Sequence, residues 1–149
     1  QRSYEKFDFD FPAHSQPSWA ARVDRWYQLD AAAYGLAEVH ATIKERPAMI
    51  ILASPGASNE ADFAFARGGA TSPAKFVPTL PNVRASALCQ VLAWHGPVIC
   101  VQKDPETWEA ALEEARGLVG EQYPVIWVLG VNHVGGTRYC VHSYRMGDP

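Results

Sequence analysis

The sequence predicts an α/β domain in which helices pack on a central sheet. Two short, continuous apolar runs, residues 48–53 and 124–131, are typical of strands that are buried on both faces. Between them, residues 108–119 repeat apolar side chains at the spacing of one helix face. Strands that alternate with helices in this way favour a layered domain, with helices that cross over between parallel strands.

Length and composition indicate one domain with a sizeable core, and they exclude several classes of protein. The 149 residues are 48% apolar and 19% charged, which is too apolar for a disordered chain. No apolar run reaches the roughly 18 residues of a transmembrane helix, so we expect no membrane span. The net charge is −3 and Lys and Arg form no cluster, so we expect no nucleic-acid partner.

The cysteines indicate a reducing compartment. Cys89, Cys100 and Cys140 lie in apolar contexts, and an odd number of cysteines does not favour a disulfide framework. Their spacing matches no zinc-binding pattern. We therefore expect buried free thiols, no metal or other cofactor, and a cytoplasmic location. The sequence begins with Gln1 instead of Met, which is expected of a trimmed or processed chain.

The N-terminal third is predicted to form a strand and then a long helix. Residues 4–11 alternate, with aromatic residues on one face and aspartates on the other, which is typical of a half-buried strand. A helix is then predicted over residues 19–43, because apolar side chains recur at helical spacing until Pro47 breaks the pattern.

The rest of the chain continues the alternation of strands and helices. The strand at 48–53 is followed by a short helix at 60–67 and a turn at Ser72. The later elements are a helix at 82–94, a strand at 97–102, a helix capped by Asp104 and opened by Pro105, a strand at 124–131, a turn at Gly135, and an edge strand at 138–144. The expected order is β-α-β-α-β-α-β-β, a mixed five-stranded sheet with helices on both faces.

Three segments resemble the N-terminal half of a β-ketoacyl synthase, a family with the thiolase fold. Residues 72–82, SPAKFVPTLPN, are similar to the S-P-x-x-F…N stretch before the helix at that family's dimer interface. Residues 96–101, GPVICV, are similar to the G-P-x-x-x-V strand that pairs across the family's dimer axis. Residues 113–116 and the strand at 125–131 resemble the helix and strand after the family's nucleophile. The resemblance covers roughly residues 20–132, and it is strongest to ketosynthase-like domains of polyketide and aryl-polyene type pathways.

The resemblance implies that residues 1–149 form a single ketosynthase-like N-terminal domain, a thiolase-like half, without ketosynthase activity of its own. An ungapped count places the family's nucleophilic cysteine on Pro105, between Asp104 and Glu106. Proline has no nucleophilic side chain, and it has no backbone N–H to donate to an oxyanion. The two histidines that ketosynthases use belong to the second half of their fold, beyond the region of resemblance. We therefore expect no Claisen condensation by this chain alone.

The first functional hypothesis is a non-catalytic module, similar to a chain-length factor of fatty-acid or polyketide biosynthesis. We expect it to form a homodimer, or a heterodimer with a catalytic ketosynthase subunit, because a short apolar edge strand at 98–102 is prone to pair. An acyl carrier protein is a further possible partner, for a basic patch that comprises Arg22, Arg25, Lys44 and Arg46. A solvated helix face is the favoured interpretation of these residues. The predicted dimer or partner interface comprises Asn82, Leu88, Val98, Ile99, Cys100, Val101 and Gln102.

The second hypothesis is a small acyl-thioester hydrolase or transferase that uses Cys140 or a histidine. Cys140 and His142 share one face of the predicted last strand. Cys100 follows His95, but its Val/Ile surroundings favour a buried structural thiol. His133 and His142 could hold a metal ion across the last hairpin, but the sequence offers no evident third ligand. A ligand-binding or carrier-binding domain without chemistry is a third alternative.

Overall fold

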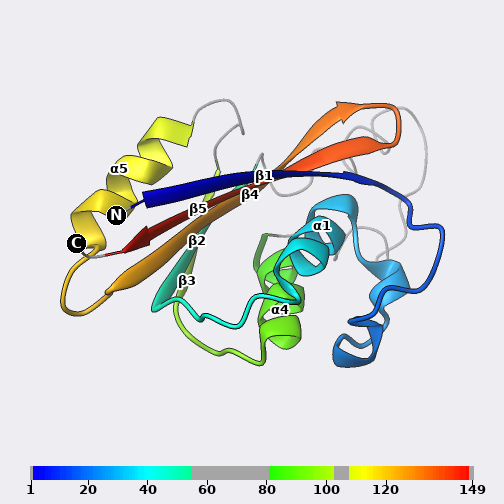
Figure 1. Cartoon of the computed structure of the whole chain (residues 1–149), viewed down its shortest axis with the longest axis horizontal. Helices are drawn as coiled ribbons and strands as arrows, with labels where there is room; N and C mark the ends of the chain where they lie inside the picture. The colour runs from blue at the N-terminus through cyan, green and yellow to red at the C-terminus, as the bar shows by residue number, and fades with distance from the viewer. Residues whose placement is uncertain (1, 55–80, 103–107, 148–149) are drawn as a thin grey trace.

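The computed structural model describes residues 2–54, 81–102 and 108–147, which contain a mixed five-stranded sheet (Figure 1). The strand order is β1-β5-β4-β2-β3. β2 is parallel to β3 and β4, whereas β5 is antiparallel to β4 and β1. The elements in chain order are β1 (Arg2–Asp10), η1 (Ala20–Arg22), η2 (Trp26–Gln28), α1 (Ala31–His40), β2 (Met49–Ser54), α4 (Pro81–Leu92), β3 (Val98–Gln102), α5 (Trp108–Leu118), β4 (Val125–Gly135) and β5 (Arg138–Gly147). The predicted α/β architecture is confirmed.

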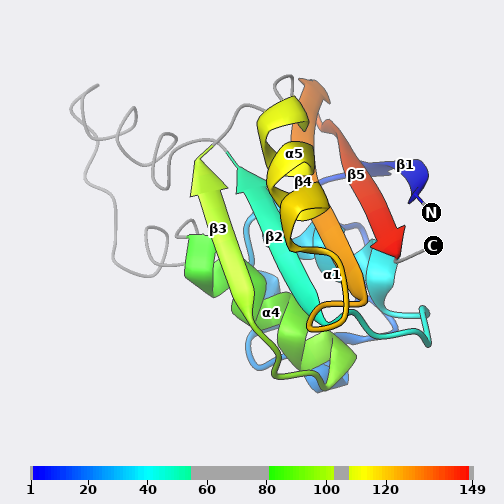
Figure 2. The same ribbon diagram turned by 90° about the vertical axis from the view of Figure 1, so that its left-hand side faces the viewer.

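Helices cover both faces of the sheet, as predicted. Figure 2 shows α5 on one face, with α1 and α4 on the other. Side chains alternate along β2: Met49 and Ile51 join the core under α5, while Ile50 and Leu52 join the core under α1 and α4. β2 is therefore buried on both faces, which accounts for its unbroken apolar sequence. None of the helices in the described ranges combines the length and the apolar composition that a membrane crossing requires.

The helix predicted over residues 108–119 is present as α5. Its charged residues are exposed, and its apolar stripe is buried against the sheet through Trp108, Ala111, Leu112 and Ala115. The residues that were expected to open this helix, Asp104 and Pro105, lie outside the described residues. So do the predicted short helix at 60–67 and the turn at Ser72.

β5 is an interior strand and not the predicted edge strand. β1 lies outside it and pairs with it antiparallel, so that Phe7 is opposite Val141 and Phe9 is opposite Tyr139. Phe7 and Phe9 pack towards the core under α1, while Asp8 is exposed on the other face. The correct alternation of β1 was readable from the sequence, but its partner was not, because the pairing joins the two ends of the chain.

Residues 19–43 do not form the single predicted helix. They form the two 3-10 turns η1 and η2 before α1 begins. Arg25 has a left-handed backbone with a φ of 54°, which interrupts a helix. The Asp30 side chain then caps α1 by accepting the N–H of Ala33 at 2.9 Å. Much of the apolar pattern that predicted the helix is nevertheless buried, with Trp19 and Val23 inside the core, whereas Tyr27 is exposed.

Gly130 of β4 lies directly against the ring of Trp108 from α5. A Cβ atom there would overlap the ring of Trp108 and would lie 2.7 Å from the carbonyl oxygen of Ala53. We expect Gly130→Ala to lower the free energy of unfolding by about 1–3 kcal/mol, because neither the large ring nor the backbone can move freely. Gly117→Ala is the matched control, since a Cβ there meets open space on α5. It should raise stability by about 0.5–1 kcal/mol, and equal urea midpoints for the two variants would contradict this packing.

Candidate functional site

β3 forms an open edge of the sheet. It is the last strand in the order, and within the described residues only β2 pairs with it (Figure 2). The N–H of Ile50 donates to the carbonyl of Pro97 at 3.1 Å, so the backbone groups of Pro97 point towards β2. Because backbone groups along a strand alternate in direction, those of Val98, Cys100 and Gln102 point away from β2, towards the open edge. No strand of the described ranges pairs with these outward donors and acceptors, so this edge is open to another strand.

The side chains of β3 make its edge apolar. Ile99 and Val101 pack against the core under α5, and Val98 packs against the core under α4. Cys100 is exposed and Cys89 is half-buried, so the prediction of buried thiols is wrong for Cys100 and is confirmed fully only for Cys140. A short apolar strand with one free edge is a surface that proteins normally cover by pairing.

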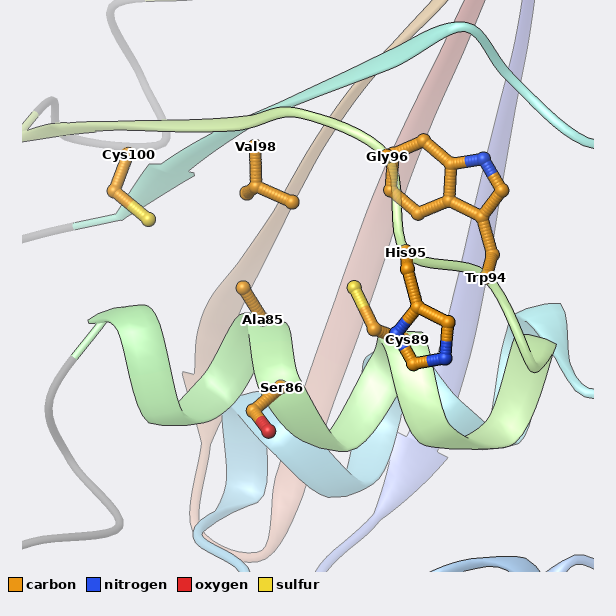
Figure 3. A pocket seen from close by; sticks show the side chains of 8 residues that line it. All are labelled: Ala85, Ser86, Cys89, Trp94, His95, Gly96, Val98 and Cys100. Atoms are coloured by element: carbon orange, nitrogen blue, oxygen red, sulfur yellow. The ribbon is translucent and has the colours of Figure 1, made fainter.

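A groove of about 350 Å³ lies beside this edge, between α4 and β3. Figure 3 shows Cys89 of α4 on one side, Val98 and Cys100 of β3 on the other, and Trp94 with His95 at one end. The full lining consists of Ala85, Ser86, Cys89, Trp94, His95, Gly96, Val98 and Cys100.

Sequence reasoning missed this groove because it extended the preceding helix to Trp94. α4 ends at Leu92, and Ala93 reverses the chain with a φ of 51°. Trp94 then packs against Gly96, where a Cβ atom would overlap the indole ring. A glycine two residues after a tryptophan was the available signal for this close approach.

The thiols of the groove are poor nucleophiles. The Cys100 residue is exposed, but partial burial of its thiol raises the pKa of that group above its ordinary value. Burial also raises the pKa of the Cys89 thiol, and the nearby Cys100 raises it further. Both groups are therefore neutral thiols at pH 7, and a catalytic cysteine would need the opposite shift.

The structure places the predicted interface residues in two different environments. Val98, Ile99, Cys100 and Val101 lie on the open strand, and Gln102 and Asn82 belong to β3 and α4. Leu88 is a correction: it is 1% exposed, in the core between α4 and the sheet, so its side chain is not available to a partner. The position of Pro105 lies outside the described residues.

A second cluster lies on the α5 face of β1 and β5, at the residues of the hydrolase hypothesis. Cys140 Sγ lies 3.4 Å from His142 Nε2, and His142 Nδ1 lies 2.8 Å from the hydroxyl oxygen of Tyr4. The ring of Trp108 packs against His142 at a centroid distance of 5.2 Å. Sequence alternation predicted correctly that Cys140 and His142 share a face, but the contribution of Tyr4 required the pairing of β1 with β5.

This cluster favours neutral side chains over a thiolate–imidazolium pair. Cys140 is 1% exposed, and burial is the main cause that raises the pKa of its thiol. Burial, and then the charge of Lys6, lower the pKa of His142. The thiol thus holds its proton and the imidazole does not gain one, so the contact lacks the ionised nucleophile of a cysteine enzyme. The two side chains are in contact, but the burial of Cys140 and the directions of both pKa shifts do not favour the hydrolase hypothesis.

The histidines considered as metal ligands do not converge. His133 Nε2 lies 2.9 Å from the carbonyl oxygen of Gly136 at the tip of the β4–β5 hairpin, whereas His142 contacts Tyr4. Across the described ranges, no three His, Cys, Asp or Glu side chains are placed to hold a metal ion.

Two of the four basic residues considered for carrier-protein binding donate hydrogen bonds to carbonyl groups at the ends of helices. Arg22 Nη1 donates to the carbonyl oxygens of Ala41 at 3.2 Å and Val91 at 3.1 Å. Arg46 Nε donates to the carbonyl oxygen of Leu92 at 2.9 Å. These guanidinium groups satisfy carbonyls that the ends of α1 and α4 leave without helical partners. Their positions are therefore explained without a carrier protein.

The three thiols should react with iodoacetamide in the order of their exposure. We expect Cys100 to be alkylated fastest, Cys89 more slowly and Cys140 slowest, because the thiols are exposed, half-buried and buried, respectively. Peptide mass spectrometry of the folded chain at pH 7 measures the three rates. Rapid alkylation of Cys140 that is lost in His142→Gln would contradict the neutral pair and would restore the hydrolase hypothesis.

Comparison with known proteins identifies the architecture. No protein-family model matches the sequence, and no curated protein matches it significantly. The fold resembles a solved structure of the ketosynthase ApeO in complex with its chain length factor ApeC from Xenorhabdus doucetiae, with a TM-score of 0.66 and 12% sequence identity. The match covers 98% of the present chain and 77% of the matched chain of that complex. The chain therefore has a ketosynthase-like fold, as its motifs predicted.

Proposed function

We propose that this chain, with its ketosynthase-like fold, is a non-catalytic subunit that works by assembling through the open edge of β3. The observation that carries the proposal is the edge itself, an apolar strand whose outward backbone groups have no partner in the described chain. The proposed partner is a second copy or a catalytic ketosynthase subunit. The solved structure with a similar fold is a complex of a ketosynthase with its chain length factor, which supports a partner of this class.

The cysteines of the described chain support a role without catalysis. Cys89, Cys100 and Cys140 all have raised pKa values, for which burial is the main cause. The sequence also aligns Pro105 with the nucleophile of the family that it resembles. A subunit of this kind contributes shape and stability to an assembly and leaves bond formation to its partner.

The groove between α4 and β3 suggests what the subunit contributes. Cys100 and Val98 belong both to the groove and to the proposed pairing strand, so a partner at the edge also borders the groove. A space at such a boundary, lined in part by Ala85, Val98 and Trp94, is suited to limit the extent of an acyl chain, as a chain-length factor would in fatty-acid or polyketide type biosynthesis.

The test compares the native mass of the wild-type chain with that of a variant whose β3 edge is blocked by proline at position 100. Light scattering on the purified chain detects a second copy, and co-purification with a ketosynthase expressed in the same cells detects a heterodimer. A chain that stays monomeric at high concentration and retains no ketosynthase overturns the proposed function.

A further inference from the structure

We infer that the groove between α4 and β3 is a binding site for the soft cation Cu⁺, held by the sulfur atoms of Cys89 and Cys100. The two residues belong to different elements, yet both line the same groove of about 350 Å³. Figure 3 shows the Cys89 sulfur directed from α4 towards β3, and the Cys100 sulfur directed from β3 towards α4. This site goes beyond the proposed function and does not depend on it.

The two thiols lie within electrostatic reach of each other. Burial is the first cause that raises the pKa of the Cys89 thiol, and the charge of Cys100 is the second. Two thiolates in so small a space repel each other, and a cation between them removes that repulsion. Cys100 is exposed and Cys89 is half-buried, so an ion from solvent can reach both sulfur atoms.

The donor atoms of the groove favour Cu⁺ over the commoner metal ions. Thiolates are soft ligands, which select Cu⁺ and Zn²⁺. A structural Zn²⁺ requires four ligands in a tetrahedron, but the described ranges bring together no three His, Cys, Asp or Glu side chains that could hold one ion. Cu⁺ is satisfied by two thiolates in a linear arrangement. Mg²⁺ and Ca²⁺ need several oxygen ligands, and among the described lining residues only Ser86 has a side-chain oxygen.

Binding of the ion must release protons, because the thiolate and not the thiol is the metal ligand. Both thiols of the groove are neutral at pH 7, since both have raised pKa values. The balanced step is two thiols and one Cu⁺ giving one copper dithiolate and two protons, so no oxidant or reductant takes part. The apparent affinity should therefore rise by about a hundredfold for each pH unit below the pKa values of the thiols.

Competition with the chelator bicinchoninate tests the site, because the Cu⁺ complex of that chelator is coloured. We expect the reduced wild-type chain, kept free of oxygen, to take one Cu⁺ per molecule, with an affinity about a hundredfold higher at pH 7.5 than at pH 6.5. Cys89→Ser and Cys100→Ser should each lower the affinity at least about a hundredfold, because the loss of a ligand costs more than the loss of an outer partner. Cys140→Ser is the matched control, since this third cysteine is 1% exposed and lies outside the groove.

Urea unfolding shows that each serine variant is folded before the affinities are compared. A wild-type chain that leaves all Cu⁺ with the chelator overturns the site, whatever the variants do. Binding that survives Cys89→Ser but not Cys100→Ser indicates an ion shared by two copies, and binding lost in Cys140→Ser places the ion beside His142. Either result also overturns the site in the groove. Light scattering measures assembly through β3 separately, so the failure of one proposal is distinguishable from the failure of the other.

Discussion

Cys100→Pro should convert the assembled chain to a monomer whose own fold is intact. Proline removes the backbone N–H of residue 100, which points to the open edge and not to β2. Edge strands tolerate proline where the missing N–H faces outward, so the pairing of β3 with β2 should survive. Each copy loses one central hydrogen bond, and the ring obstructs the approach of the other strand. We expect the dissociation constant to rise by at least about tenfold, which corresponds to about 1.4 kcal/mol.

Two matched variants make this result specific. Cys100→Ala removes the thiol but keeps the N–H, and it should assemble like the wild type. Ile99→Pro removes an N–H that points towards β2, and it should destabilise the fold itself, because a ladder hydrogen bond is lost. Light scattering across a concentration series measures assembly, and urea unfolding measures the fold. A Cys100→Pro chain that still dimerises like Cys100→Ala would show that β3 is not the assembly surface.

β2 and β4 could be predicted because the local sequence alone indicates that they are buried. β2 and the first part of β4 lie between two helical layers, so residues 49–53 and 125–131 form continuous apolar runs that reveal the two strands directly. α5 has one buried face, and its helical spacing shows which face that is. In each of these cases neighbouring residues carry the whole signal.

The sequence-based predictions were wrong where the structure depends on residues that are distant in sequence, or on the backbone conformation of a single residue. The interior position of β5 depends on its pairing with β1, more than 120 residues away in sequence, as Phe7 opposite Val141 shows. The break before α1 depends on the left-handed Arg25, and the groove depends on the same conformation at Ala93. Neither arginine nor alanine favours that conformation, so periodicity alone extended both helices too far.

For the candidate site, too, local features were predicted correctly and features that depend on the packing of distant elements were missed. The apolar strand at 98–102 and its tendency to pair were visible in the sequence, together with the resemblance of GPVICV to a pairing strand. Leu88 was misassigned to the surface because helix spacing does not reveal which apolar residues of α4 turn towards the sheet. Tyr4 was missed for the reason that β1 was misplaced, since its contact with His142 joins the first and last strands.

His40 should make the chain lose stability as the pH falls from about 6.5 to about 4. It is the last residue of α1 and is fully buried, with Nδ1 2.7 Å from the carbonyl oxygen of Leu36 and Nε2 3.1 Å from the hydroxyl oxygen of Ser143. Its ring stacks on Trp127 at a centroid distance of 5.5 Å. The neutral imidazole satisfies both contacts, because Nδ1–H donates to the carbonyl and Nε2 accepts the hydroxyl proton.

The direction of the effect follows from the two pKa values. Burial lowers the pKa of His40 from 6.5 to about 4, against the opposing contribution of the Leu36 carbonyl and with a smaller lowering by Arg145. Above pH 6.5 both the folded and unfolded chains hold a neutral imidazole, so the contribution to stability is complete. Between these pH values the unfolded chain binds a proton that the folded chain does not bind. The free energy of unfolding therefore decreases as the pH is lowered from 6.5 to 4.

The expected loss is about 3 kcal/mol across this window, because each pKa unit of difference is worth about 1.36 kcal/mol. Urea unfolding at a series of pH values measures it, and the wild type must be compared with His40→Gln. Carboxylates titrate at similar pH in both chains, so their contribution cancels in the difference. His40→Gln should be less stable at pH 7 but should show the flatter pH dependence. If the two chains lose stability with the same slope between pH 6.5 and 4, His40 is not the group that resists protonation in the core.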